Sequence, residues 1–137
     1  MFFQRIQNIL ANYGMSLVRG AGVTLLIATV STFFGCIIGY IVGIIQTIPV
    51  SKRDNPVKRT VLGVVRAILR AYVEVFRGTP MMVQAGFIYY GLLYAGVDLP
   101  WLAAALLIVS INTGAYMAET VRGGILSIDE GQTEGAK

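Results

Sequence analysis

The sequence predicts an all-α integral membrane protein, with three transmembrane helices preceded by an amphipathic N-terminal helix. Hydrophobic residues make up 55% of the 137 residues and charged residues only 13%, and the mean hydropathy is +0.70. A soluble domain normally carries about 25% charged residues. The 16 glycines also fit, because glycine is commoner in membrane helices than in soluble ones.

The composition argues against several other classes of protein. Cys36 is the single cysteine and histidine is absent, so neither a metal site nor a histidine-based catalytic centre is expected. The sequence contains no glycine-lysine phosphate-binding loop, and the chain is predicted not to be an enzyme. The basic residues behind the net charge of +4 gather between apolar segments, which favours a topology signal over nucleic-acid binding.

Residues 1–19 are predicted to form an amphipathic helix along the membrane surface. Arg5 and Arg19 interrupt this stretch and no small-residue cleavage site follows an apolar core, so it does not read as a signal peptide. Its apolar residues recur at helical spacing: Phe2, Phe3, Ile6, Ile9, Leu10, Tyr13 and Leu17.

Residues 20–49 are predicted to form the first transmembrane helix. Positions 20 to 51 contain no charged residue, and about 20 apolar residues are enough to cross a bilayer. A stripe of small residues predicts close packing against another helix. The stripe consists of Thr24, Ala28, Ser31, Gly35, Gly39 and Gly43, and the last four are the helix-packing candidates. Lining of a substrate path by Thr24 and Ser31 is the alternative.

Residues 50–77 form a basic connection that sets the predicted orientation. Seven of the 11 basic residues lie there: Lys52, Arg53, Lys58, Arg59, Arg66, Arg70 and Arg77. Basic loops favour the cytoplasmic side, so the N-terminus and Asp98 are expected outside and the C-terminal tail inside. The residues from Arg59 to Arg77 place one polar stripe on a helix, which suits a membrane-surface helix, or a polar cavity or partner subunit.

The sequence Arg77-Gly78-Thr79-Pro80 predicts a helix start or a kink. Threonine is a favourable N-cap and proline a favourable first helical residue. Free N–H groups beside Arg77 would suit an anion such as an amino-acid carboxylate. The alternative is that Arg77 only marks the cytoplasmic border.

Residues 78–97 and 99–122 are predicted to be the second and third transmembrane helices, with Asp98 and Pro100 at the turn. Asn112, Tyr116 and Glu119 share one face of the third helix. Polar groups are expensive in lipid unless they face protein or water. These three residues and Arg77 are therefore the candidate substrate-pathway residues, with an ion pair between Glu119 and Arg122 as the alternative for Glu119.

Two segments carry a family resemblance. Residues 72–92, YVEVFRGTPMMVQAGFIYYGL, closely resemble the signature of permease subunits of polar-amino-acid ABC importers, and residues 112–137, NTGAYMAETVRGGILSIDEGQTEGAK, resemble the next conserved block. The resemblance follows most of the chain in order. It implies a five-helix permease fold, with a cytoplasmic EAA loop that docks on an ATPase subunit.

The resemblance also implies that residues 1–137 are one permease domain that is truncated within its coupling loop. The tail, residues 127–137, would begin that loop, and Ser127 and Glu130 have capping-box spacing. The coupling candidates are Gly131, Gln132, Glu134, Gly135 and Ala136. Gly135 stands where the family has its first alanine, and Asp129-Glu130 stand where it usually has proline and a basic or polar residue.

The expected function is that of a multi-pass subunit in the bacterial cytoplasmic membrane that forms the pathway for a polar amino acid. The resemblance implies no cofactor on this chain, with ATP and Mg²⁺ on the partner ATPase. It implies three protein partners: the ATPase, a second permease copy or homologue, and an extracytoplasmic amino-acid-binding protein. A homo-oligomeric channel subunit, complete at this length, is the alternative, and a purely structural membrane scaffold is a third.

Overall fold

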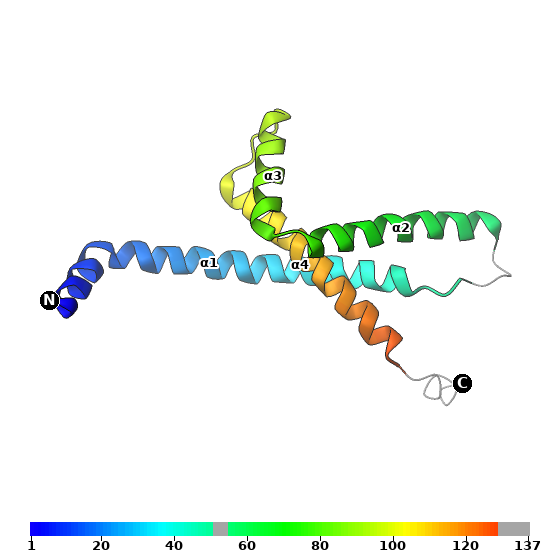
Figure 1. Ribbon diagram of the computed structural model, residues 1–137, viewed down its shortest axis with the longest axis horizontal. Coiled ribbons are helices and arrows are strands. Elements are labelled where there is room, and N and C mark those ends of the chain that lie inside the picture. The colour runs from blue at the N-terminus through cyan, green and yellow to red at the C-terminus, as the bar shows by residue number, and fades with distance from the viewer. Residues whose placement is uncertain (51–54, 129–137) are drawn as a thin grey trace.

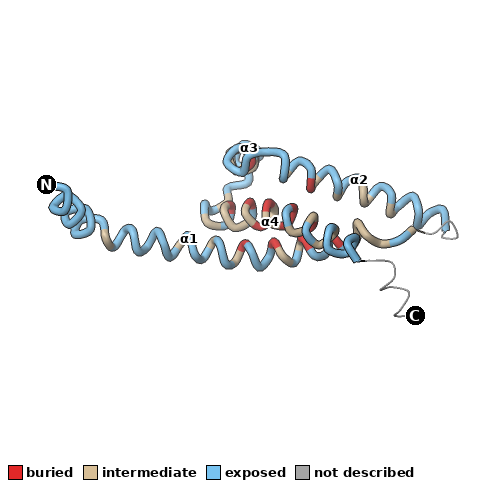
Figure 2. The backbone as a smooth tube through the Cα atoms, turned by 60° about the horizontal axis from the view of Figure 1, so that its bottom comes forward, coloured by how far each residue is buried: buried red, intermediate tan, exposed pale blue. Residues whose placement is uncertain are grey.

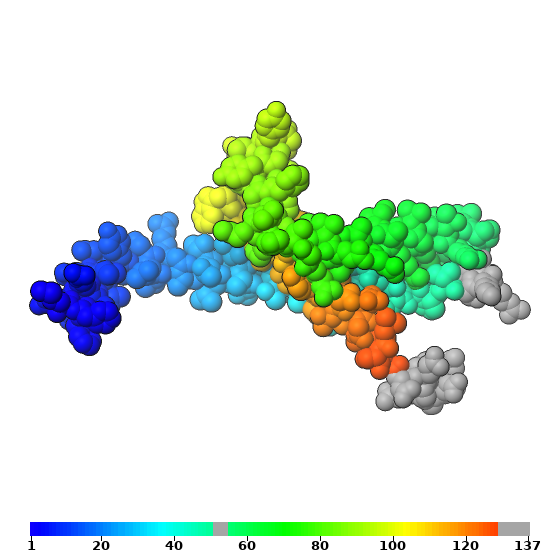
Figure 3. Space-filling view, in the orientation of Figure 1, coloured from blue at the N-terminus to red at the C-terminus, as the bar shows by residue number. Residues whose placement is uncertain are grey.

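The computed structural model describes residues 1–50 and 55–128, and this part of the chain forms four helices (Figure 1). They are α1 (Phe2–Thr47), α2 (Pro56–Gly78), α3 (Met81–Tyr94) and α4 (Trp101–Leu126). α2 lies alongside the C-terminal part of α1, α4 crosses both, and α3 projects away from the other helices (Figures 1 and 3). The described residues are therefore all-helical, as the sequence predicts.

The first helix is longer than expected. The surface helix of residues 1–19 and the membrane helix of residues 20–49 are one continuous helix of 46 residues, about 69 Å long at 1.5 Å per residue. Gly14, Gly20 and Gly22 do not interrupt it, because glycine within a helix costs only about 1 kcal/mol relative to alanine. The first turns of α1 bend away from the axis of the remainder (Figure 1).

Two of the described helices, α1 and α4, are long and apolar enough to cross a membrane. α3 has only 14 residues, about 21 Å, whereas the apolar core of a bilayer is about 30 Å thick. The expected helix of residues 78–97 is thus shorter at both ends. The structure accordingly offers two candidate spans where the sequence predicts three.

The turn after α3 explains its early end. The N–H of Ala95 donates to the carbonyl of Gly91 at 3.0 Å, and the N–H of Val97 donates to that of Leu92 at 2.9 Å. Gly96 has a φ of 83°, a left-handed conformation that glycine adopts without a Cβ clash. α4 then begins after Pro100 and continues through Gly123 and Gly124, four residues beyond the expected end at residue 122.

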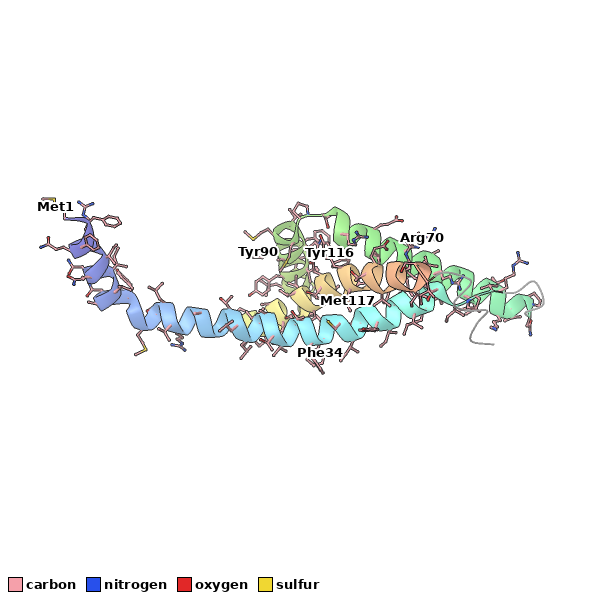
Figure 4. All side chains as sticks on the ribbon, turned by 90° about the horizontal axis from the view of Figure 1, so that it is seen from below. Met1, Phe34, Arg70, Tyr90, Tyr116 and Met117 are labelled. Atoms are coloured by element: carbon pink, nitrogen blue, oxygen red, sulfur yellow. The ribbon has the colours of Figure 1, made fainter. Side chains whose placement is uncertain are left out.

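The core of the structure is the seam where α1 packs against α4 (Figure 2). A Cβ atom added to Gly35 would lie 2.6 Å from the Cβ of Thr113, and one added to Gly43 would lie 2.8 Å from the Cβ of Val121. Gly39 meets Met117 in the same way, and Met117 lies between the two helices in Figure 4. The seam therefore has room only for glycine at three successive turns of α1.

Polar contacts extend the same seam. The buried Ser31 hydroxyl donates to the carbonyl of Leu106 at 3.2 Å, one turn before Gly35. Gly114 of α4 faces Ile38 of α1 and the hydroxyl of Tyr72 of α2. That hydroxyl donates to the carbonyl of Ile111 at 2.5 Å, so α2 is held to α4 where α4 meets α1. The small residues of the predicted packing stripe, from Ser31 to Gly43, are thus directed at α4.

Candidate functional site

The break between α2 and α3 is the centre of the candidate site. Thr79 ends α2 in an extended conformation, with φ −116° and ψ 143°, and Pro80 occupies the N-cap position of α3. A residue before proline is disfavoured in the helical region, which places the break at Thr79. The Thr79 hydroxyl donates back to the carbonyl of Val75 at 2.7 Å and does not cap α3. The predicted boundary is present, but proline occupies the N-cap position that was expected for threonine.

Gln84 connects the two sides of this break. Its Nε2 atom lies 2.9 Å from the carbonyl oxygen of Phe76, 2.8 Å from that of Thr79 and 2.7 Å from the Thr79 hydroxyl. The last carbonyls of a helix have no partner within the helix. A buried amide on α3 therefore supplies donors to the open end of α2.

Asn112 joins the same network from α4. Its Nδ2 atom donates to Oε1 of Gln84 at 3.0 Å and to the carbonyl of Phe76 at 3.3 Å. Both amide side chains are buried. The structure thus directs Asn112, a predicted pathway residue, at the α2–α3 break.

Arg77, Tyr116 and Glu119, the other three predicted pathway residues, meet one turn further along α4. The Arg77 guanidinium carbon lies 5.7 Å from the centre of the Tyr116 ring, within cation–π range. Nη1 of Arg77 lies 3.7 Å from Oε2 of Glu119. Tyr116 is 49% exposed and lies beside α2 and α3 in Figure 4. One face of α4 therefore brings Asn112, Tyr116 and Glu119 to the C-terminal end of α2, where Arg77 lies.

Glu119 also holds Arg122 of its own helix. Nη2 of Arg122 donates to Oε1 of Glu119 at 2.9 Å, and Nε donates to Oε2 at 3.2 Å. This is the ion pair that the sequence offered as an alternative role for Glu119. The contact to Arg77 is longer, so Arg122 is the primary partner. We call Arg77, Glu119 and Arg122 the Glu119 cluster.

A pocket of about 370 Å³ lies beside the Glu119 cluster and is bounded by three helices. Gln46 comes from α1, Arg66, Arg70 and Glu74 come from α2, and the Glu119 cluster closes the remaining side. These side chains include four arginines and two glutamates, so the lining carries two more positive than negative charges. Part of the polar stripe of α2, from Arg66 to Arg77, faces this pocket, whereas Arg59 does not line it.

Two residues that hold the candidate site together were not predicted from the sequence, Tyr72 and Gln84. The helical spacing around Tyr72 does not indicate that its hydroxyl reaches the carbonyl of Ile111. Gln84 was not singled out, although it is the one amide in the apolar stretch from Met81 to Leu93. A polar amide in such a stretch is expensive in lipid, so it needs a hydrogen-bonding partner inside the protein. This requirement could have singled out Gln84 from the sequence.

The coupling candidates Gly131, Gln132, Glu134, Gly135 and Ala136 lie outside the described residues. The same holds for Glu130 of the expected capping box. Ser127 is described, and its hydroxyl donates to the carbonyl of Gly124 at 2.8 Å, at the C-terminal end of α4.

Comparison with known families identifies the class of protein. Residues 59–137 match the family described as binding-protein-dependent transport system inner membrane component, and the chain belongs to that family. The matched region holds most of α2, the α2–α3 break and the polar face of α4. The family resemblance that the two sequence segments carry is confirmed.

The relatives that the chain matches are named as permeases of amino-acid transporters. The chain is 34% identical over 119 residues to “Probable amino-acid ABC transporter permease protein YckA” of Bacillus subtilis. That alignment covers 87% of this chain and 47% of the relative. It is 36% identical over 121 residues to “Glutamine transport system permease protein GlnP” of Escherichia coli K12. That alignment covers 86% of this chain and 49% of the relative. The chain spans about half the length of the curated relatives it matches.

A solved structure shows the same arrangement of helices. It is described as the crystal structure of an amino acid ABC transporter with histidines. The superposition has a TM-score of 0.68 at 29% identity and covers 89% of this chain and 55% of that one. The fold described above is therefore that of an ABC transporter permease.

Proposed function

We propose that this chain forms part of the translocation pathway of an ATP-driven importer for a polar amino acid. The observation that carries the proposal is the polar face of α4, where Asn112, Tyr116 and Glu119 follow one another in a candidate membrane span. Such groups are expensive in lipid and mark substrate pathways when they face a cavity. The names of the relatives, amino-acid and glutamine permeases, support the substrate class.

Within this pathway Arg77 binds the carboxylate of the substrate. Its side chain is 41% exposed and its contact to Glu119 is long, at 3.7 Å. Arg122 keeps Glu119 paired through two shorter hydrogen bonds, so Glu119 retains a partner when Arg77 turns to a substrate. Tyr116 lies against the guanidinium and orients it, and Asn112 fixes the neighbouring α2–α3 break.

ATP hydrolysis takes place on a partner chain. Gly131, Gln132, Glu134, Gly135 and Ala136 contribute to a cytoplasmic loop that docks on that ATPase, which carries ATP and Mg²⁺, and this chain binds no cofactor. A second permease copy or homologue and an extracytoplasmic amino-acid-binding protein complete the transporter. The chain lies in a bacterial inner membrane with its N-terminus outside. The seven basic residues between positions 52 and 77 support that orientation.

The test uses a version of the chain extended to the full length of its relatives and reconstituted with the ATPase and the binding protein. Arg77→Gln is expected to raise the KM for amino-acid uptake and to leave basal ATPase activity unchanged. Glu134→Ala is expected to lower the substrate-stimulated ATPase activity while membrane insertion stays intact. Arg59→Gln removes the same charge outside the pocket and serves as the control for Arg77→Gln.

Two results would overturn the proposal. Unchanged uptake in Arg77→Gln would contradict the assignment of Arg77 as the residue that binds the substrate carboxylate. Failure to co-purify with an ATPase, together with ion conductance by the chain alone, would favour a channel over an importer subunit.

A further inference from the structure

The pocket between α1, α2 and α4 contains donors that the described residues do not satisfy. Nε and Nη2 of Arg66 and Nε2 of Gln46 are buried and have no hydrogen-bond partner. Both side chains line the pocket. Buried polar groups in folded proteins almost always have a partner. The pocket therefore lacks an acceptor that fits these donors.

The geometry of Arg66 indicates what kind of acceptor is missing. Nε and Nη2 lie on one edge of the guanidinium and form a planar fork that matches two oxygens of a carboxylate or phosphate. Arg122 uses the same two atoms to hold both oxygens of Glu119, at 3.2 and 2.9 Å. Arg66 thus presents to the pocket the same pair of donors as Arg122, but the pair of Arg122 is occupied by Glu119 and the pair of Arg66 has no acceptor.

The charge balance of the pocket favours an added anion. Glu119 is taken by Arg122 and Arg77, whereas the ion pairs of the described residues include neither Arg66 nor Arg70. Glu74 is the remaining carboxylate of the lining. Even with Glu74 counted against one of these two arginines, one positive charge stays uncompensated.

The position of the pocket points to the source of the anion. Gln46 lies in the last turn of α1, where the apolar span ends, and α2 follows from the basic connection. A basic pocket between helices at the end of a span meets lipid headgroups directly. The same end of α1 carries exposed apolar residues, such as Ile41 and Ile44, which offer a surface for acyl chains.

We propose that this pocket binds the phosphate of an anionic phospholipid through the fork of Arg66, with Gln46 as a further donor. Arg66 and Arg77 line the same pocket but stand 11 residues apart on α2, about three helical turns. Binding at the fork of Arg66 does not depend on which amino acid is transported. A bound phosphate ties α2 to the end of α1 on the basic side of the membrane.

Native mass spectrometry of the purified chain with phosphatidylglycerol tests the proposal. The wild type is expected to retain one phosphatidylglycerol through delipidation. Arg66→Gln should bind it about tenfold more weakly, the loss expected when a charge-assisted hydrogen-bonding partner is removed. Gln46→Leu should weaken it about fivefold without any change of charge.

Matched controls separate this site from general surface charge. Arg59→Gln removes the same charge from the same helix outside the pocket. Thr47→Val alters the residue next to Gln46; the Thr47 hydroxyl donates to the carbonyls of Gly43 and Ile44. Both controls should keep the bound lipid. Circular dichroism confirms that each variant folds. Equal losses in Arg59→Gln and Arg66→Gln, or full retention in both pocket variants, would overturn the site.

A second arm distinguishes a lipid from a free oxyanion. Inorganic phosphate in excess is expected neither to displace phosphatidylglycerol nor to raise the thermal stability of the delipidated chain. A phosphate-dependent rise in stability that Arg66→Gln abolishes would identify a site for free phosphate and overturn the lipid assignment.

Discussion

Oε1 of Gln84 accepts a hydrogen bond from Nδ2 of Asn112 at 3.0 Å, and through this contact α4 reaches the break between α2 and α3. The Nε2 atom of the same glutamine serves acceptors of Phe76 and Thr79. A single buried amide therefore joins three helices. Its removal affects the orientation of α3, which has few other contacts with the described helices.

Gln84→Leu should destabilise the chain by about 1–3 kcal/mol, because the buried amide of Asn112 loses its acceptor Oε1 and the carbonyl of Thr79 loses a donor. Reversible unfolding in detergent measures the change. Gln7→Leu, at an exposed position of α1, is the control and should be nearly neutral. A double-mutant cycle with Asn112→Leu should give a coupling of about 0.6 kcal/mol, typical of hydrogen bonds between membrane helices. A coupling of zero would contradict the network.

Gly39→Leu should separate α1 from α4 and lower the free energy of unfolding by about 1–3 kcal/mol, since Met117 already fills the available space. Gly22→Leu is the matched control, because no atom lies within 4 Å of a Cβ built at Gly22. The comparison uses unfolding in mixed detergent micelles. Equal stability of the two variants would mean that α1 and α4 do not form this seam.

A cysteine at position 116 should react with a membrane-impermeant maleimide, whereas one at position 118 should not. Tyr116 is 49% exposed and Ala118 is fully buried on the same helix. Both variants, Tyr116→Cys and Ala118→Cys, are made in a Cys36→Ser background, because Cys36 is the single native cysteine. Labelling of the full-length transporter tests whether the polar face of α4 is accessible to water. No reaction at position 116 would place it against lipid or protein.

The orientation predicts which positions react from outside the cell. If the proposed orientation holds, Gln4→Cys and Asp98→Cys should be labelled in intact spheroplasts, and Asn55→Cys only after the membrane is opened, because segments rich in Lys and Arg are retained in the cytoplasm. Each variant again carries Cys36→Ser. The opposite pattern would invert the topology and place the arginine pocket outside.

Local rules account for much of the helical plan, including the start of α2, which was not predicted. The break at Thr79 and Pro80 follows from the preference of the residue before proline, and the start of α2 follows from Asn55 and Pro56, with Oδ1 of Asn55 accepting from the N–H of Val57 at 3.1 Å. Hydropathy found α1 and α4. It overestimated α3, because a charge-free window does not register a turn at Gly96.

The candidate site was only partly predictable. Spacing along α4 placed Asn112, Tyr116 and Glu119 on one face, because helical periodicity is a local property. Which groups they meet depends on how α2 crosses α4, and no local pattern encodes that crossing. The fork of Arg66 has the same origin: periodicity placed Arg66 on the polar stripe, and only the packing of three helices left its edge without an acceptor.

Three successive protruding side chains of the seam between α1 and α4 come from α4, whereas α1 contributes Ile38 over Gly114. Thr113, Met117 and Val121 protrude from α4 into hollows over Gly35, Gly39 and Gly43 of α1. A larger residue on α1 is then tolerable only where the facing residue of α4 shrinks at the same time. Substitutions along this seam should therefore be inherited in pairs, and a chain with the hollows transferred to α4 and the knobs to α1 should fold as well.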